Sequence, residues 1–150
     1  MEAESLANSG EKAQAETLLK GLHGNGENNP LQQKERNLAD NFLAGLLIER
    51  KKYDAAEKIL NRQLVLDDPD LVFSAFFKKA EIMQGRGLRK EALRLYYQTV
   101  LLFPADPRRA EALYNTWNLM QELKDPRAPK IAEMLKREYP NSPFAKKVFF

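Results

Sequence analysis

The chain contains no cysteine and only one histidine, and both scarcities restrict the chemistry open to it. Without cysteine there is neither a disulfide nor a thiolate metal ligand, and cysteine usage leaves the redox compartment open. The one histidine, His23, lies beside a glycine-rich stretch, which favours a solvated surface residue over a general base or ligand. We therefore expect a protein that is not an enzyme and that has no cofactor and no metal site.

Long apolar runs are also missing. The longest, around residues 42–48, falls far short of the roughly 20 residues that a bilayer-spanning helix needs, so we expect no membrane span. Residues 1–20 lack the apolar stretch of a secretory signal. The compartment stays open between the periplasm or cell envelope and the cytoplasm.

The net charge of +3 conceals an uneven distribution. Residues 1–75 carry 9 Lys and Arg against 13 Asp and Glu, a net charge of −4, whereas residues 76–150 carry 15 against 8, a net charge of +7. A basic half can attract an acidic partner. Its basic residues are scattered over separate predicted helices, which favours a solvated face, with nucleic-acid binding as the alternative.

A period of 36 residues organises most of the chain. Ala56, Ala92 and Ala128 are spaced by 36, and Ala44, Ala80 and Thr116 precede them by 12. Each copy reads as an apolar first helix, a polar turn, an amphipathic second helix and a proline exit. A unit this short cannot bury its own apolar face, so consecutive units are expected to stack into a solenoid.

Helix boundaries are indicated by an Asx or Ser residue followed by proline, a pair that caps the first turn and tolerates the missing N–H. These pairs begin at Asn29, Asp68, Asp106, Asp125 and Ser142. Apolar residues recur at spacings of three and four residues, and no stretch alternates between apolar and polar residues for long enough to predict a strand. The predicted helices are 11–22, 31–50, 54–66, 70–84, 88–102, 107–122, 127–138 and 143–149.

These features resemble a tetratricopeptide repeat, a family with small residues at the helix crossing, a turn aromatic, a turn glycine and a final proline. The matching positions are Tyr53, Gly87, Tyr96 and Pro104, whereas Thr116 and Leu123 occupy positions that favour alanine and glycine. The resemblance implies an all-α, right-handed α-α superhelix. It covers roughly residues 37–140, and residues 139–145 look like bacterial cell-envelope members of the family.

These features predict that the chain is organised in three parts. Residues 1–30 are predicted to be a degenerate half-repeat and a flexible loop, residues 31–142 three repeats, and residues 143–150 a terminal helix. That terminal helix either begins a further repeat of a longer protein or folds back onto the array.

The resemblance also implies a concave, partner-binding groove lined by the first helix of each repeat. The predicted lining residues are Asn41, Ile48, Phe77, Glu81, Gln84, Leu113, Trp117 and Met120. The clamp that some members use for acidic chaperone tails is not matched, because its positions read Asn41, Gly45, Lys78, Ala110 and Tyr114.

Trp117, the only tryptophan, has two interpretations. A large aromatic at the centre of a groove is typical of a binding hot spot. Alternatively, Trp117 packs against the final helix, with Phe144, Val148 and Phe149 filling the groove.

The sequence thus predicts a protein-protein interaction scaffold that binds a peptide or helix, without a small-molecule substrate. Self-association through exposed ends, giving a homo-oligomer, and nucleic-acid binding through the basic half are the alternatives.

Overall fold

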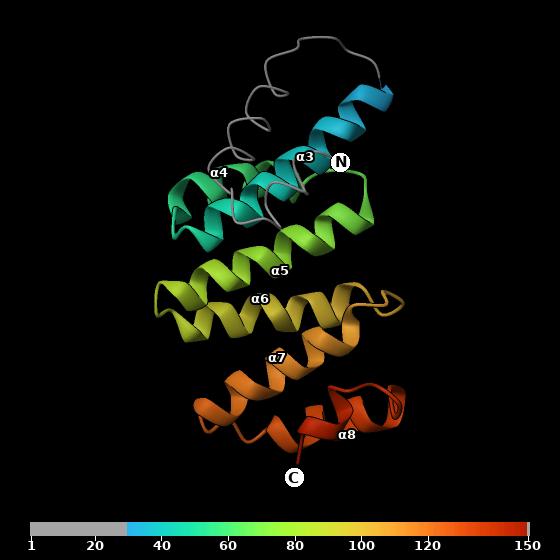
Figure 1. Ribbon diagram of the computed structural model, residues 1–150. Helices are drawn as coiled ribbons and strands as arrows, with labels where there is room; N and C mark the ends of the chain where they lie inside the picture. Colours follow the sequence, from blue (N-terminus) through green and yellow to red (C-terminus); the bar gives the residue numbers. More distant parts are fainter. Residues whose placement is uncertain (1–29, 150) are drawn as a thin grey trace. The chain divides into compact units, whose positions relative to one another are not determined.

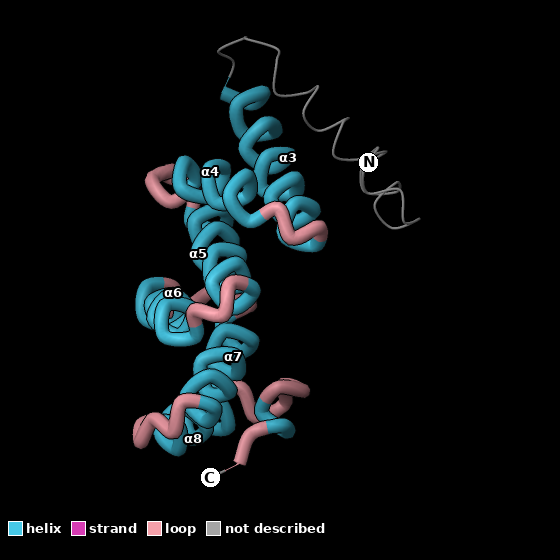
Figure 2. The backbone as a smooth tube through the Cα atoms, turned by 90° about the vertical axis from the view of Figure 1, so that its left-hand side faces the viewer, coloured by secondary structure: helices cyan, strands magenta, loops and turns pink. Residues whose placement is uncertain are grey.

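The computed structural model describes residues 30–149, and every regular element within that range is helical (Figure 2). The elements are α3 (Pro30–Glu49), α4 (Tyr53–Gln63), α5 (Pro69–Gly85), α6 (Arg89–Leu102), α7 (Arg109–Glu122), α8 (Ala128–Glu138) and the 3-10 helix η1 (Ala145–Lys147). No strand occurs between residues 30 and 149, which confirms the all-α class. The predicted helix 11–22 lies outside the described residues, as does all but the last residue of the predicted half-repeat and loop, residues 1–30.

The chain divides into two compact units, and the division falls within α5. The first unit ends at Lys78 and contains α3, α4 and the first part of α5; the second begins at Lys79. In the first unit α3 packs against α4. In the second, α7 packs against both α6 and α8, so helices that follow one another in sequence lie side by side (Figure 1).

The small residues of the 36-residue pattern lie in the core of the helix pairs. The exposed fraction is 0% for Ala44, Ala56, Ala80, Ala92 and Thr116, and 2% for Ala128. Small side chains at these positions let two helices approach closely, because nothing larger than a methyl or hydroxyl group projects from the backbone. The first helix of each pair (α3, α5, α7) is hereafter distinguished from the second (α4, α6, α8).

The turn inside each helix pair repeats the same backbone geometry. One residue of each turn adopts a left-handed conformation, with φ of 60° at Lys51, 78° at Gly87 and 55° at Lys124. The next amide then donates to a carbonyl five residues back, and all three of these hydrogen bonds measure 2.8 Å. This is the Schellman termination, which satisfies carbonyl groups left unpaired at a helix end.

The third turn departs from the expected spacing by one residue. The sequence period places Leu123 at the left-handed position, whereas the structure gives that conformation to Lys124. The extra residue is accommodated because the second helix begins differently: α4 and α6 start two residues after the left-handed residue, and α8 starts four residues after it, at Ala128. Asp125, Pro126 and Arg127 form an additional turn in between.

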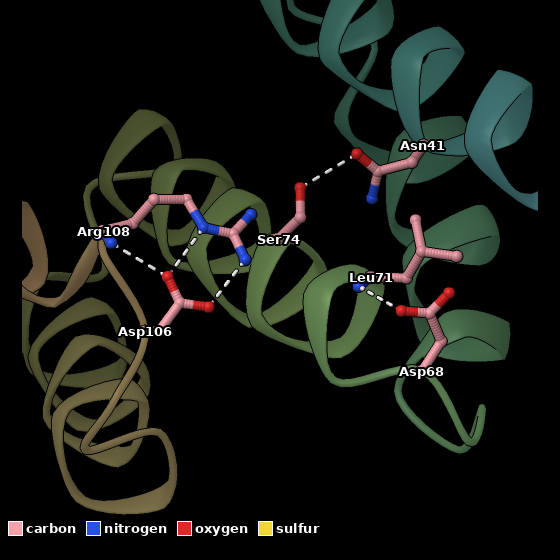
Figure 3. A network of polar contacts seen from close by, with 6 residues as sticks. All are labelled: Asn41, Asp68, Leu71, Ser74, Asp106 and Arg108. Carbon is pink, nitrogen blue, oxygen red and sulfur yellow. Dashed lines mark hydrogen bonds and ion pairs between the residues drawn. The ribbon is translucent and has the colours of Figure 1, made fainter.

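Aspartates before prolines organise the helix starts, but in two ways. At α5, Pro69 is the first helical residue and the Asp68 carboxylate accepts a hydrogen bond from the Leu71 amide at 3.3 Å (Figure 3). At α7 and α8 the proline precedes the helix instead. Those helices therefore begin one or two residues later than predicted.

The turns before α7 and α8 share an Asp-Pro-Arg clamp. The Asp106 carboxylate accepts from the Arg108 amide at 2.8 Å and from two guanidinium nitrogens at 2.9 and 2.8 Å (Figure 3). Asp125 holds Arg127 in the same manner, at 2.9, 3.0 and 2.8 Å. The arginine's side-chain hydrogen bonds and then its backbone hydrogen bond lower the pKa of Asp125 from 3.8 to about 2.

The predicted terminal helix 143–149 is wrong. Only Ala145–Lys147 form a single 3-10 turn, and Val148 is extended, with ψ of 152°. The approach to this turn nevertheless copies the approach to α7 one period earlier, since the amides of Asp106 and Ser142 donate to the carbonyls of Phe103 and Tyr139 at 3.3 and 3.0 Å. The segment therefore begins like a first helix and then leaves the helical path.

The left-handed turn residues generate a prediction about stability. Left-handed backbone costs an L-residue about 1–2 kcal/mol, and glycine avoids most of that cost. We expect Lys51→Gly and Lys124→Gly each to raise the free energy of unfolding by about 0.5–1 kcal/mol, net of the greater entropy of the unfolded chain. Gly87→Ala should lower it by about 1 kcal/mol through backbone strain alone, because no atom lies within 4 Å of its Cβ position. Urea titrations of the three variants would decide, and a stabilising Gly87→Ala would contradict the assignment.

The Asp125 clamp generates a second prediction, for acid pH. A depressed folded-state pKa contributes stability that is complete above the unfolded pKa, near 3.8, and is lost as the pH falls towards about 2. The difference in unfolding free energy between the original chain and Asp125→Asn should therefore be constant above about pH 5 and shrink between pH 4 and 2. Arg127→Gln should move the pKa of Asp125 back towards 3.8 in an NMR carboxyl titration. An unchanged pKa in that variant would exclude the clamp.

Candidate functional site

In the first unit, Asn41 of α3 lies at the centre of a buried polar network. Its amide donates to Oε1 of Gln63 on α4 at 2.9 Å, and its Oδ1 accepts from Oγ of Ser74 on α5 at 2.9 Å (Figure 3). Gln63 donates in turn to the carbonyl of Asn37 at 2.7 Å. Asn41 is only 7% exposed, and such buried amides need hydrogen-bond partners. One side chain thus connects three helices of this unit.

Lys78 reaches the same asparagine from one turn further along α5. Its Nζ donates to the backbone carbonyl of Asn41 at 2.8 Å and also contacts Oδ1 of the same residue. The contact between α3 and the first part of α5 is therefore polar and carries a positive charge. Gly45 lies beside it, and a Cβ there would be 3.5 Å from Cε and Nζ of Lys78, an ordinary contact distance.

The other predicted lining residues of the first unit are partly covered. Ile48 and Phe77 are half-buried. The ring of Phe77 stacks on Phe73 with centroids 6.1 Å apart, and Phe73 is only 1% exposed. Phe77 therefore presents part of an aromatic face that is supported by the core beneath it.

In the second unit, Glu81 and Gln84 on the last turns of α5 are exposed. Gln84 accepts a hydrogen bond from the Tyr96 hydroxyl at 2.9 Å. Burial of the Tyr96 ring raises the pKa of its phenol, and the nearby carboxylates of Glu81 and Glu111 raise it further. These two lining residues therefore form a polar, acidic end of the α5 surface.

The three predicted lining residues of α7 are buried. Leu113 and Met120 are 0% exposed, and Trp117 is 4% exposed. They do not form an open apolar groove in this conformation. Helix α7 is packed between α6 and α8, and Trp117 is in addition covered by the segment that follows α8.

Residues 144–149 cover α7 through ring contacts. Phe144 packs on Tyr114 with centroids 5.5 Å apart, and Phe149 meets the indole of Trp117 edge-on at 5.1 Å. Tyr114 and Trp117 themselves are 5.9 Å apart. These four residues are called the aromatic cluster below. Of the two interpretations of Trp117, packing against the final segment describes its position here, although that segment is extended and 3-10 rather than α-helical.

The indole N–H of Trp117 is a buried donor for which no acceptor occurs among the described residues. A buried, unpaired N–H costs about 1–3 kcal/mol, and native structures contain few of them. The Trp117 indole therefore places an unpaired polar N–H group within a cluster of aromatic rings.

An ion pair that the sequence does not predict joins α7 to the end of α8. Arg109 donates to Glu138 at 2.8 Å and through Nε to the carbonyl of Val100 at 3.0 Å, with its side chain 8% exposed. The only sequence signal is the Arg108-Arg109 pair, which does not distinguish a clamp residue from a buried one. Arg109 thus serves the packing of the second unit, and its charge is already balanced.

The described part of the chain contains few side chains arranged for catalysis or for metal binding. Between residues 30 and 149, no three His, Cys, Asp or Glu side chains are grouped as metal ligands. No helix in this range is both long and apolar enough to cross a bilayer. His23, the only histidine, lies outside the described residues.

Comparison with known proteins supplies no family. No protein-family model matches the chain, and no curated protein matches it. The functional conclusion therefore depends on the contacts, burial and charge described above.

The burial of Trp117 predicts how the second unit responds to substitution there. Trp117→Ala should lower the free energy of unfolding by about 3–5 kcal/mol, because it empties a core position. Trp117→Phe keeps a ring and removes the unpaired N–H, so its cost should stay below about 1.5 kcal/mol. Urea unfolding followed by far-UV circular dichroism measures both. A loss under about 1 kcal/mol for the alanine variant would show that the ring is not part of the core.

Proposed function

We propose that this chain is a tetratricopeptide-like right-handed superhelix that binds a polypeptide segment on the faces of its first helices, without chemistry of its own. Three equivalent left-handed turns at Lys51, Gly87 and Lys124 support the repeat. The buried small residues of each helix pair support it as well. Repeats of this kind present extended surfaces to other chains.

The observation that carries the proposal is that α7 already holds a short segment of polypeptide that is not α-helical. Phe144 and Phe149 are bound by ring contacts to Tyr114 and Trp117, and Val148 is 5% exposed. Aromatic side chains bury much area at a small cost in rotamer entropy, which is why they dominate peptide-binding faces. A surface that binds this chain's own segment has the chemistry to bind a similar segment from another protein.

Basic residues of the second unit give less support to nucleic-acid binding. Arg108, Arg109 and Arg127 are paired with carboxylates at 2.8 Å. Side chains engaged in this way are not free to follow a phosphate backbone. Polypeptide binding is therefore the function that the described contacts favour.

A peptide-display selection on the full chain, followed by affinity measurement, tests the proposal. Tyr114→Ala should weaken the selected peptides by about tenfold or more, as expected for a hot-spot residue. Tyr97→Ala is the matched control, because Tyr97 is also half-buried but lies on α6, a second helix. The Cζ atom of Arg127 lies 5.4 Å from the centroid of the Tyr97 ring. The control should change affinity by less than about twofold. Equal effects of the two substitutions, or no selected peptide, would contradict binding at α7.

A further inference from the structure

The segment that covers α7 is anchored unevenly along its length. Ala145 and Val148 are 4% and 5% exposed, whereas Phe149 is 66% exposed. The amides of Ala145 and Lys147 donate to the carbonyls of Ser142 and Phe144, both at 3.1 Å. Residues 144–148 are therefore held by burial and hydrogen bonds. Phe149 makes a T-shaped contact with Trp117 and leaves most of its own surface in solvent.

Two features of this site indicate the chemistry of a replacement for Phe149. The first is the indole N–H of Trp117, a buried donor without an acceptor among the described residues. An incoming segment that brings a carbonyl oxygen to this N–H gains a hydrogen bond that the present cover does not make. The second feature is the T-shaped contact itself, since its 5.1 Å centroid distance shows that an aromatic ring fits there.

The charge around the aromatic cluster favours an acidic segment. Residues 79–149 carry 14 Lys and Arg against 8 Asp and Glu, a net charge of +6. Lys146 and Lys147 are exposed within the covering segment, and the Lys147 ammonium lies 5.7 and 5.6 Å from the ring centroids of Tyr114 and Phe144. A carboxylate beside an incoming aromatic residue would meet the Lys147 ammonium at the cluster.

We propose that the aromatic cluster is the docking site for an acidic, extended polypeptide segment of another protein, whose aromatic side chain replaces Phe149 against Trp117. In this arrangement residues 144–148 stay in place, and Phe149 turns away about the extended backbone at Val148. The inference rests on the proposed function, and it adds the partner's chemistry and the residue that keeps the site closed.

The test uses the full chain and a fluorescein-labelled synthetic peptide of about ten residues, in which one phenylalanine is flanked by glutamates. Removing the internal competitor by Phe149→Ala should tighten binding about three- to tenfold, because the peptide no longer displaces a bound ring. The matched control is Leu101→Ala, which removes an apolar side chain of α6 that is 62% exposed. That control should leave the affinity within about twofold.

Three further readouts examine the chemistry of binding. Replacing the peptide's phenylalanine by alanine should abolish binding, and replacing its glutamates by lysines should weaken it more than tenfold at low salt. Trp117→Phe should weaken binding about three- to tenfold through loss of the N–H. Because Trp117 is the only tryptophan, its emission should shift when the unlabelled peptide binds.

The outcomes separate this inference from the proposed function. Equal or weaker binding by Phe149→Ala, or binding that ignores the peptide's phenylalanine or its charge, overturns the inference. If display-selected peptides still depend on Tyr114 in that case, the proposed function stands. Light scattering that shows dimers lost on Phe149→Ala would also overturn it, because the occupant would then be a second copy of this chain.

Discussion

The close approach of two helices across small side chains is the constraint on which the rest of this structure depends. Ala44 and Ala56 in the first unit, and Ala80 and Ala92 in the second, are all fully buried. Each pair is joined by a turn of only a few residues, so the helices are fixed near their linked ends. A larger side chain at the crossing would separate them and open the core along their length, because protein interiors are close-packed. The apolar faces of the first and second helices can be shared only while this crossing stays tight.

Much of the fold could be predicted because its signals are local. Proline positions and apolar spacing located six helices to within a few residues, and the alanines that follow the 36-residue period are all buried. Where the prediction failed, packing between residues distant in sequence determined the local conformation. The final segment has a helix start at Ser142 and apolar residues at helical spacing, but a short helix is costly to nucleate. Ring contacts with α7 outweigh that weak local preference.

The candidate site was less predictable, for a similar reason. The period placed Trp117 on the first-helix face, but its burial depends on residues 144–149, whose path no pattern in the sequence specifies. The partners of Asn41 are 22, 33 and 37 residues away, and nothing in the sequence distinguishes this asparagine from a solvated one. Register along a helix is a local property. The contacts of a side chain depend on which distant segment packs against it.

Two contacts of a first helix differ in their chemistry: the contact of α3 with the first part of α5 in the first unit, and the contact of α7 with residues 144–149 in the second. In the first unit Asn41, Ser74 and Lys78 make it polar and hydrogen-bonded, so its geometry is specified by directional bonds with short range. In the second unit Tyr114, Trp117, Phe144 and Phe149 make it aromatic. Ring contacts are less directional than hydrogen bonds, so one aromatic ring can replace another without leaving polar groups unpaired. An exchangeable cover is therefore easier to accommodate in the second unit, where the residue that covers Trp117 is itself mostly in solvent.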